Sequence, residues 1–472
     1  MKRFLRQSIY IAFTVFLTCS PLGGIHAEAT RPNVLMICID DLNDWVGFLG
    51  GHPDALTPQM DALAERGRIF ANAHCAVPVC SASRVSVMSG VHATTHGSYE
   101  LGPRYEELPA LADTPTMQRY FRDHGYTTLS GGKVLHHGFS GRLADDVERS
   151  LGREKGRKPR KAMNRPNHWS PAWDWGAFPS SDTEMADFRL ATRAAEVLQE
   201  PFSRPFFMSI GFFRPHVPLY VPPRWFDLYR ADALALPSSP ASDLVDVPKN
   251  FLGINDYAVA PTHAEVISSG KQRGLTQAYL ASISFVDHCV GIVLEGLKAS
   301  AHRDNTLVVL WSDHGFHLGE KQHWAKRTLW EESTRVPLLI SGPGIESGRP
   351  CQEPVSLVDI YPTLVERCGL PTNARLEGLS LAPQIDQPST PRSRPAITSS
   401  YFGNHSIRSR RWRLIVYDDG AMELYDHQTD PSEVHNLADD SQYKEVRDQL
   451  IGWIPETAAR EHKRKSERTR AR

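Results

Sequence analysis

The segment Asn33–Asp41 has the sequence NVLMICIDD, an apolar run that ends in two aspartates. An uninterrupted apolar run of this length is typical of a strand that is buried on both faces of a parallel sheet. Ligands bind beyond the carboxyl ends of such strands, and two adjacent carboxylates there repel each other unless positive charge lies between them. The segment therefore predicts a central strand of an α/β fold with a charged site at its end.

Apolar strands and amphipathic helices alternate along most of the remaining chain. The predicted strands cover Tyr126–Leu129, Pro205–Ile210, Thr306–Ser312 and Val336–Ser341, and the predicted helices cover Pro58–Arg66, Met117–His124, Leu275–Leu297 and Leu357–Cys368. Thr57-Pro58 and Thr114-Pro115 each offer an N-cap followed by a proline suited to the first helical turn. This order predicts an α/β fold with a large, mostly parallel sheet sandwiched by helices.

Near residue 375 the alternation of long apolar strands and helices gives way to short apolar runs separated by turn residues. We expect a catalytic α/β domain over residues 30–375 and a smaller C-terminal α+β subdomain over residues 376–459. Short apolar runs at Ser406–Arg408, Trp412–Tyr417 and Met422–Tyr425 alternate with turn residues, which is typical of an antiparallel sheet. A closing helix is predicted over Tyr443–Ala458. The basic tail, residues 460–472, is predicted to be disordered.

The first 29 residues have the features of a secretory signal peptide. Lys2, Arg3 and Arg6 precede the apolar run Ile9–Leu17, and small residues up to Ala29 suit cleavage. The apolar run is too short to span a membrane, and no later stretch approaches the needed length. Cys19 follows threonine, which disfavours a lipoprotein site. We therefore expect a secreted or periplasmic protein with no transmembrane segment.

Composition argues against several other classes of protein. Lys+Arg 53 nearly balance Asp+Glu 54, so no global field points to nucleic acid. Seven cysteines are too few for a disulfide scaffold of this length. Cys38 is interpreted as an inert core thiol, whereas a Cys351–Cys368 pair stays open. The basic insert Arg142–Asn167 is interpreted either as a solvated loop or as a segment that contacts a polyanion.

The chemistry of the chain begins at Cys80-Ser-Ala-Ser-Arg84, which leads into a helix-like run that ends at Gly90. A thiol beside an arginine and a helix start is either a nucleophile with a lowered pKa or a residue that is modified. Asp313-His314 follows another apolar strand, as Asp40-Asp41 does. Three carboxylates with one histidine suit a divalent cation such as Ca²⁺ or Mg²⁺, and the histidine leaves Mn²⁺ or Zn²⁺ open.

Three further segments supply cationic or titratable side chains after predicted strands. A Gly-Gly pair precedes Lys133 and His136, prolines flank His216, and a stretch rich in titratable groups ends at Lys326. The Gly-Gly turn and the lone His216 are each more often structural, whereas the stretch that ends at Lys326 is more specific. A metal-stabilised domain without catalysis does not explain all four residues together.

These motifs resemble those of the formylglycine-dependent sulfatases, within the alkaline-phosphatase-like superfamily. Cys80-x-Ala82-x-Arg84 is similar to the family's Cys-x-Pro-x-Arg sequence, and Gly132-Lys133-x-x-His136 is similar to its second signature. The segments around Lys133, His216 and Lys326 look most like the iduronate-2-sulfatase group. The resemblance runs from about Asn33 to the predicted C-terminal sheet.

The resemblance implies a role for each residue. Cys80 is oxidised to formylglycine and hydrated, and one hydroxyl of the hydrate attacks sulfur while Arg84 and Lys133 hold the hydrate and the anionic oxygens. His136 is the base for the second hydroxyl, and His216 and Lys326 bind sulfate and assist the leaving oxygen. One Ca²⁺ per chain is expected, with Mg²⁺ or Mn²⁺ as substitutes. The implied ligands are Asp40, Asp41, Cys80, Asp313 and His314.

The expected substrate is a sulfated carbohydrate, for which iduronate serves only as a family label. Ala82 stands where the family usually has proline. Alanine there is associated with radical sulfatase-maturating enzymes, whereas the usual proline suits the oxygen-dependent formylglycine-generating enzyme. Two alternatives stay open: a phosphonate monoester or phosphodiester hydrolase that uses the same aldehyde, and an unmodified, catalytically inactive binding homologue.

Overall fold

Strand β1 (Asn33–Asp40) lies at the centre of a 7-stranded sheet in the computed structural model, which describes residues 31–249 and 259–462. From one edge to the other, the strands are β2 (Gly67–Ile69), β12 (Leu338–Ser341), β9 (Thr306–Ser312), β1, β7 (Phe206–Pro215), β4 (Thr127–Gly132) and β5 (Arg149–Gly152). The strands from β9 to β5 run parallel, and β12 is antiparallel to both of its neighbours. The mostly parallel sheet predicted from the sequence is confirmed.

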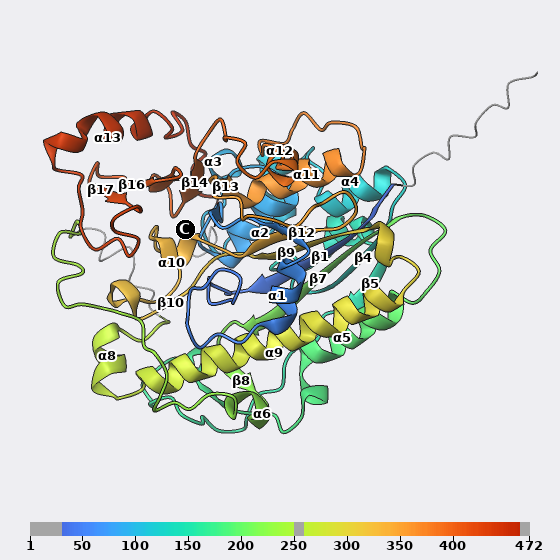
Figure 1. The fold of residues 1–472 in the computed structure, drawn as a ribbon, viewed down its shortest axis with the longest axis horizontal. Helices are drawn as coiled ribbons and strands as arrows, with labels where there is room; N and C mark the ends of the chain where they lie inside the picture. Colours follow the sequence, from blue (N-terminus) through green and yellow to red (C-terminus); the bar gives the residue numbers. More distant parts are fainter. Residues whose placement is uncertain (1–30, 250–258, 463–472) are drawn as a thin grey trace, which may run out of the picture. The chain divides into compact units, whose positions relative to one another are not determined.

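The two faces of this sheet are covered by different helices (Figure 1). Side chains of a strand alternate between faces, so Leu35, Ile37 and Ile39 of β1 enter one core cluster and the residues between them enter the other. The first cluster is completed by α1 (Pro58–Ala64), α5 (Ala186–Val197) and α9 (Gln272–Ala299), and the second by α2 (Cys80–Ser89), α4 (Met117–Asp123) and α11 (Ile360–Arg367). An apolar run without alternation is thus explained by two buried faces.

A second sheet follows in the C-terminal part of the chain. Its antiparallel strands are β14 (Ala396–Ser399), β15 (His405–Arg408), β16 (Trp412–Val416) and β17 (Met422–Asp426), and helix α13 (Lys444–Ile451) packs on it. The antiparallel sheet and its helix were predicted, whereas β14 was not. Residues from Arg31 onward form one unit, and the boundary near residue 375 stays a prediction.

Shorter elements complete the described chain. They are β3 (Ala73–His74), α3 (Ala93–His96), β6 (Trp175–Ala177), β8 (Leu219–Val221), α6 (Pro223–Phe226), α8 (His263–Ser268), β10 (His317–Leu318), β11 (Trp324–Ala325), α10 (Glu331–Thr334), β13 (Val355–Ser356) and α12 (Ala382–Asp386). The predicted signal peptide, Cys19 and most of the predicted basic tail lie outside the described residues.

The predicted helix boundaries need two corrections. Helix α4 is capped by Thr116, whose side chain accepts the Arg119 backbone N–H, and not by Thr114. Helix α13 ends at Ile451 instead of continuing to residue 458, because Gly452 and Pro455 follow it.

The structure also bears on three other expectations. Part of the basic insert is strand β5 at the sheet edge, so it is not a loop throughout. Cys351 and Cys368 are both buried free thiols. Among the described helices, α9 alone is long and apolar enough to cross a membrane, contrary to the expected absence of such a stretch, but 78% of its most apolar window is buried in the protein.

Candidate active site

Acidic residues follow two adjacent strands at the same edge of the sheet. Ile39 of β1 pairs with Ser312 of β9, so Asp40 and Asp41 lie beside Asp313 and His314, and all four side chains are fully buried. Parallel pairing of the two strands therefore explains why these charged residues converge.

Asp41 holds an uncommon backbone conformation in this turn. Its φ is 60°, in the left-handed region that non-glycine residues seldom adopt. The Tyr279 hydroxyl donates to the Asp41 carbonyl oxygen at 2.7 Å, and the Asp41 N–H donates to Asp313 Oδ1 at 3.2 Å. Such strained residues persist where surrounding contacts fix them, and they cluster at functional sites.

Cys80 reaches the same place as the first residue of α2. Ligand atoms of Asp40, Cys80, Asp313 and His314 all lie within 4.8 Å of one another, and Asp40 and Asp41 form a second such group with His216. Helix α2 ends at Gly90, which has φ 66°, as the sequence predicted. The fold thus brings together the ligands expected from separate segments of the chain.

Three cationic side chains contact these carboxylates. Arg84 Nε donates to Asp313 Oδ2 at 2.7 Å, and its Nη2 lies 3.3 Å from Asp40 Oδ1. Lys133 forms an ion pair with Asp40, and Lys326 Nζ donates to the carboxylate of the neighbouring Asp41 at 2.5 Å. The positive charge required between adjacent buried carboxylates is therefore supplied by residues of three different motifs.

These charges alter the acidity of the cluster. Burial raises the pKa of the Cys80 thiol, but Lys133 and Lys326 outweigh burial and hold that pKa below its ordinary value. Burial raises the pKa of Asp313 to about 7 although Arg84 lowers it. A cysteine with a lowered pKa in an electropositive setting is chemically reactive, unlike a structural core thiol.

Histidine nitrogens complete the site. Nδ1 of His314 and Nδ1 of His216 lie 2.9 Å and 2.5 Å from the carbonyl oxygen of the following residue, so each ring carries its proton there and leaves Nε2 as a lone pair. These Nε2 atoms are 3.3 Å and 3.9 Å from the carboxylate of Asp41. Burial lowers the pKa of His216 to about 4 and that of His136 to about 3.

His136 is placed differently from the other predicted catalytic residues. Its ring packs edge-on against His137 with centroids 4.7 Å apart. Within the described chain it forms no hydrogen bond or ion pair with the carboxylates or Cys80, although Lys133 contributes to its lowered pKa. His136 therefore borders the cluster without contacting it.

The donor set fits a divalent cation. Asp41 Oδ2 is buried and has no hydrogen-bond partner among the residues that the structure describes. Oxygens from three buried carboxylates, joined by the Nε2 lone pair of His314, form the oxygen-rich set that Ca²⁺, Mg²⁺ and Mn²⁺ prefer. A buried carboxylate oxygen without a donor is costly, and a bound cation satisfies it.

A third group of ligand-type residues, Glu331, His427 and Glu433, has a structural explanation instead. Arg413 is fully buried and forms ion pairs with both glutamates, and Arg408 pairs with Glu331. Because these guanidinium groups already neutralise the carboxylates, the cluster joins α10 to the C-terminal sheet and does not need a metal.

Sequence reasoning missed residues that support the site from a distance. Tyr279, which holds the Asp41 turn, lies inside the apolar pattern of α9, and no motif marks it. Cys38 was expected to be an inert core thiol. It is buried and burial raises its pKa to about 12, but Arg84 Nη1 donates to its Sγ at 2.9 Å. Contacts of this kind join residues far apart in the chain, so no local pattern could reveal them.

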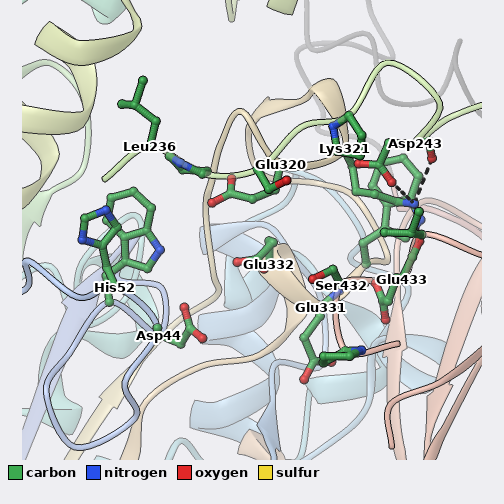
Figure 2. Close-up of a pocket in the computed structure, with 18 of the residues that line it drawn as sticks. Asp44, His52, Leu236, Asp243, Glu320, Lys321, Glu331, Glu332, Ser432 and Glu433 are labelled. Atoms are coloured by element: carbon green, nitrogen blue, oxygen red, sulfur yellow. Dashed lines mark hydrogen bonds and ion pairs between the residues drawn. The ribbon is translucent and has the colours of Figure 1, made fainter. Parts of the chain in front are cut away.

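A cavity of about 310 Å³ lies in front of Trp330 and α10. Figure 2 shows the carboxylates of Asp44, Glu320 and Glu332 directed into it. Burial raises the pKa of all three carboxyl groups, that of Glu320 to about 7. This acidic lining does not suit an anionic ester, whereas the cations around Cys80 do.

Two family models match the chain. The model described as Sulfatase matches residues 32–370, and the model described as N-sulphoglucosamine sulphohydrolase, C-terminal, matches residues 319–459. A protein named Sulfatase from Formosa agariphila is 37% identical over 451 residues, covering 92% of this chain and 88% of that protein. Iduronate 2-sulfatase of Mus musculus is 26% identical, covering 92% of this chain and 95% of that protein. Choline-sulfatase of Rhizobium meliloti is 29% identical, covering 87% and 83%.

Solved structures share the fold. A phosphonate monoester hydrolase from Silicibacter pomeroyi has a TM-score of 0.74 at 21% identity, covering 89% of this chain and 94% of that chain. A structure in complex with its substrate D-glucosamine-2-N,6-O-disulfate has a TM-score of 0.69 at 21% identity, covering 90% of this chain and 96% of that chain. At these identities the likeness establishes the alkaline-phosphatase-like fold.

Proposed function

The chain belongs to the sulfatase family of sulfate ester hydrolases, and we propose that it removes sulfate from a sulfated sugar with a formylglycine nucleophile made from Cys80. The observation that carries this proposal is the convergence of ligand atoms from Asp40, Cys80, Asp313 and His314 within 4.8 Å. Lys133 and Lys326 border this cluster and offer the positive charge that a sulfate group needs.

The proposed reaction needs two groups besides these side chains: a formylglycine hydrate and a divalent cation. A hydrated formylglycine at position 80 supplies a hydroxyl nucleophile, and a divalent cation, for which we propose Ca²⁺, supplies positive charge next to it. Asp40, Asp41, Asp313 and His314 would hold the cation. Arg84 orients the carboxylates by bridging Asp313 and Asp40.

The remaining residues bind the ester and move protons. Lys133 and Lys326 lie almost fully buried, where charge is weakly screened, and they would hold the sulfate oxygens. His216 and Lys326 would lie beside the leaving oxygen, and the Lys326 ammonium would donate the proton that it needs, because the low pKa of His216 leaves that ring unprotonated. His136, unprotonated near neutral pH because of its low pKa, would accept a proton as general base.

The relatives are named for different substrates. Names among them include iduronate 2-sulfatase and choline-sulfatase. The structural neighbour solved with a disulfated glucosamine supports a sugar. Phosphonate hydrolysis remains the second candidate because the same cations would bind either tetrahedral anion.

Maturation and location belong to the same proposal. We propose that Cys80 is converted by a radical sulfatase-maturating enzyme, for which alanine at position 82 is suited, or by a formylglycine-generating enzyme. We also propose that the signal segment directs the protein to the periplasm or the exterior. Proteolysis and mass spectrometry of protein from the native host should give the Cys80 peptide with formylglycine mass. An intact thiol there would refute the nucleophile.

Substrate class is tested by release of inorganic sulfate. Sulfated monosaccharides and disaccharides of defined sulfate position are expected to be hydrolysed, and aryl phosphonates and phosphodiesters far more slowly. Lys326→Gln should abolish release, whereas Lys298→Gln, a change at an exposed lysine on α9, should not. Preferential hydrolysis of phosphonates would favour the second candidate.

A further inference from the structure

A cavity of about 900 Å³ opens beside Lys133 and is bounded by the part of the basic insert that follows β5. Arg153, Lys155 and Lys158 of this insert line it together with Lys133. The insert is tied to the catalytic loop, because Arg153 Nη2 donates to the carbonyl oxygen of His136 at 2.7 Å. The cavity therefore adjoins the cations that we assign to sulfate binding.

The lining of this cavity keeps free positive charge. Glu154 accepts hydrogen bonds from two arginines of α5 at 2.7 Å and 2.8 Å, and Arg157 forms an ion pair with Glu184. By contrast, the side chains of Lys155 and Lys158 are exposed and form no hydrogen bond or ion pair within the described residues. Arg153 is held by a carbonyl oxygen and the two α5 arginines by one carboxylate, whereas the ammonium groups of Lys155 and Lys158 remain available to an anion.

An aromatic ring lies between the catalytic cations and the insert. The β1–β7 register shifts from Ile39↔Phe212 to Asp40↔Pro215, which leaves Phe213 in a bulge. Asp187 holds this bulge by accepting the Phe213 N–H at 3.0 Å. The Phe213 ring is 36% exposed and lies 5.4 Å from Lys133 Nζ. Arg214 also lies 5.4 Å from this ring and the His216 ring packs against it at 4.7 Å. The exposed part of the ring, beside cations, suits the apolar part of a sugar whose substituents are anionic.

We propose that Lys155 and Lys158 form a subsite for a second anionic group of the substrate, carried by the sugar unit next to the one that loses sulfate. This inference rests on the proposed function, since it assumes that sulfate is cleaved beside Lys133. Two exposed lysines contribute modestly, so the expected preference for a charged neighbouring unit is about fivefold in kcat/KM. The preference should disappear in high salt, because exposed charges are screened there.

Three disaccharides that differ at one position test the subsite. All carry the same cleavable sulfate, and the neighbouring unit carries a carboxylate, a second sulfate, or a neutral hydroxymethyl group. The full-length protein is compared with the double variant Lys155→Gln/Lys158→Gln and with a matched control, Arg160→Gln/Lys161→Gln. The control removes two exposed charges from the same insert at positions that do not line the cavity.

The wild-type protein is expected to prefer one or both charged disaccharides about fivefold in kcat/KM. The lysine variant should lose this preference through a raised KM at unchanged kcat, and the control variant should keep it. The charged disaccharide that is preferred identifies the group bound by the subsite as a carboxylate or a sulfate. Equal preference in all three proteins would overturn the subsite, as would equal loss in both double variants.

Binding to the Cys80→Ser protein, measured by calorimetry, separates this inference from the proposed function. Suppose that the two lysine substitutions weaken binding of a charged disaccharide, and that the wild-type protein releases sulfate from no ester. This combination would reject the proposed function and retain the subsite. Identical binding by the Cys80→Ser protein with and without the two lysines would reject the subsite alone.

Discussion

Arg84 Nε and Asp313 Oδ2 lie 2.7 Å apart at a position where neither side chain has any exposed surface. The same guanidinium reaches Asp40 Oδ1 at 3.3 Å and donates to the carbonyl oxygen of Val134 at 3.1 Å. One side chain thus joins the ends of β1 and β9 to the loop after β4. A planar group with five donors can form all these contacts at once, and an ammonium cannot.

Replacement of Arg84 by lysine is therefore expected to damage both stability and activity. The free energy of unfolding should fall by about 3–5 kcal/mol because buried carboxylates lose a partner, and sulfate release should fall roughly a hundredfold. Urea unfolding and initial rates measure the two effects. In the control Arg230→Lys, whose pair with Asp232 is exposed, stability should change by less than about 1 kcal/mol. Similar losses in both variants would contradict the assigned role of Arg84.

Asp313→Asn tests the cation site without relying on activity. A ligand that binds only the folded protein raises stability by about 2.7 kcal/mol when its concentration is a hundred times Kd. Added Ca²⁺ should therefore raise Tm in the wild-type protein and much less in the variant, because the amide replaces one carboxylate charge. Asp304→Asn, at an aspartate that is 86% exposed, should keep the full response. A full Ca²⁺ response in the Asp313 variant would remove that residue from the ligand set.

Asp287 should make stability depend on pH. Its carboxylate accepts the backbone N–H groups of Gln59 and Met60 at the start of α1, and burial raises its pKa from 3.8 to about 7. Between these two values the folded protein binds more protons than the unfolded chain. The stabilisation is therefore complete below about pH 4 and is lost as pH rises through 7.

The measurement is urea unfolding at several pH values. Asp287→Asn keeps an acceptor oxygen but cannot ionise, so its stability relative to the wild-type protein should rise from pH 5 to pH 8. The slopes of the free energy of unfolding against pH should differ between the two proteins by at most about 1.4 kcal/mol per pH unit. Parallel pH curves for the two proteins would show that Asp287 does not titrate in this window.

Arg413 should be essential for attachment of the C-terminal sheet. It is fully buried, pairs with Glu331 and Glu433, and donates to the carbonyl oxygen of Leu329 at 2.9 Å. Arg413→Ala removes the guanidinium that Glu331 and Glu433 share, which leaves Glu331 with Arg408 and Glu433 with His427, and should reduce the free energy of unfolding by about 3–5 kcal/mol.

Arg411→Ala is the matched control on the same hairpin. Its pair with Asp426 is partly exposed and screened by solvent, so the loss should be far smaller than that caused by Arg413→Ala. Comparable losses would mean that burial of the Arg413 network does not matter. A loss of bound metal on Arg413→Ala, measured by atomic absorption, would instead indicate that Glu331, His427 and Glu433 hold an ion.

The sequence predicted the elements whose signals are local. An unbroken apolar run from Asn33 to Ile39 requires a strand with two covered faces, and the structure has that strand at the centre of the sheet. Strand β14 was missed because Ala396–Ser399 is short and pairs on one side only. Helix α13 was predicted too long because its apolar pattern continues past the glycine and proline that end it.

The sequence by itself determined which residue types stand at the strand ends and at the start of α2, since motifs are contiguous and hydrophobic periodicity reports burial. Only the tertiary structure decided that Arg84 joins Asp313 to Asp40, that Tyr279 holds the Asp41 turn, and that the basic insert borders a cavity beside Lys133. The physical reason is that these contacts span up to 238 positions along the chain. Their geometry arises from strand register and helix packing, which no local pattern encodes.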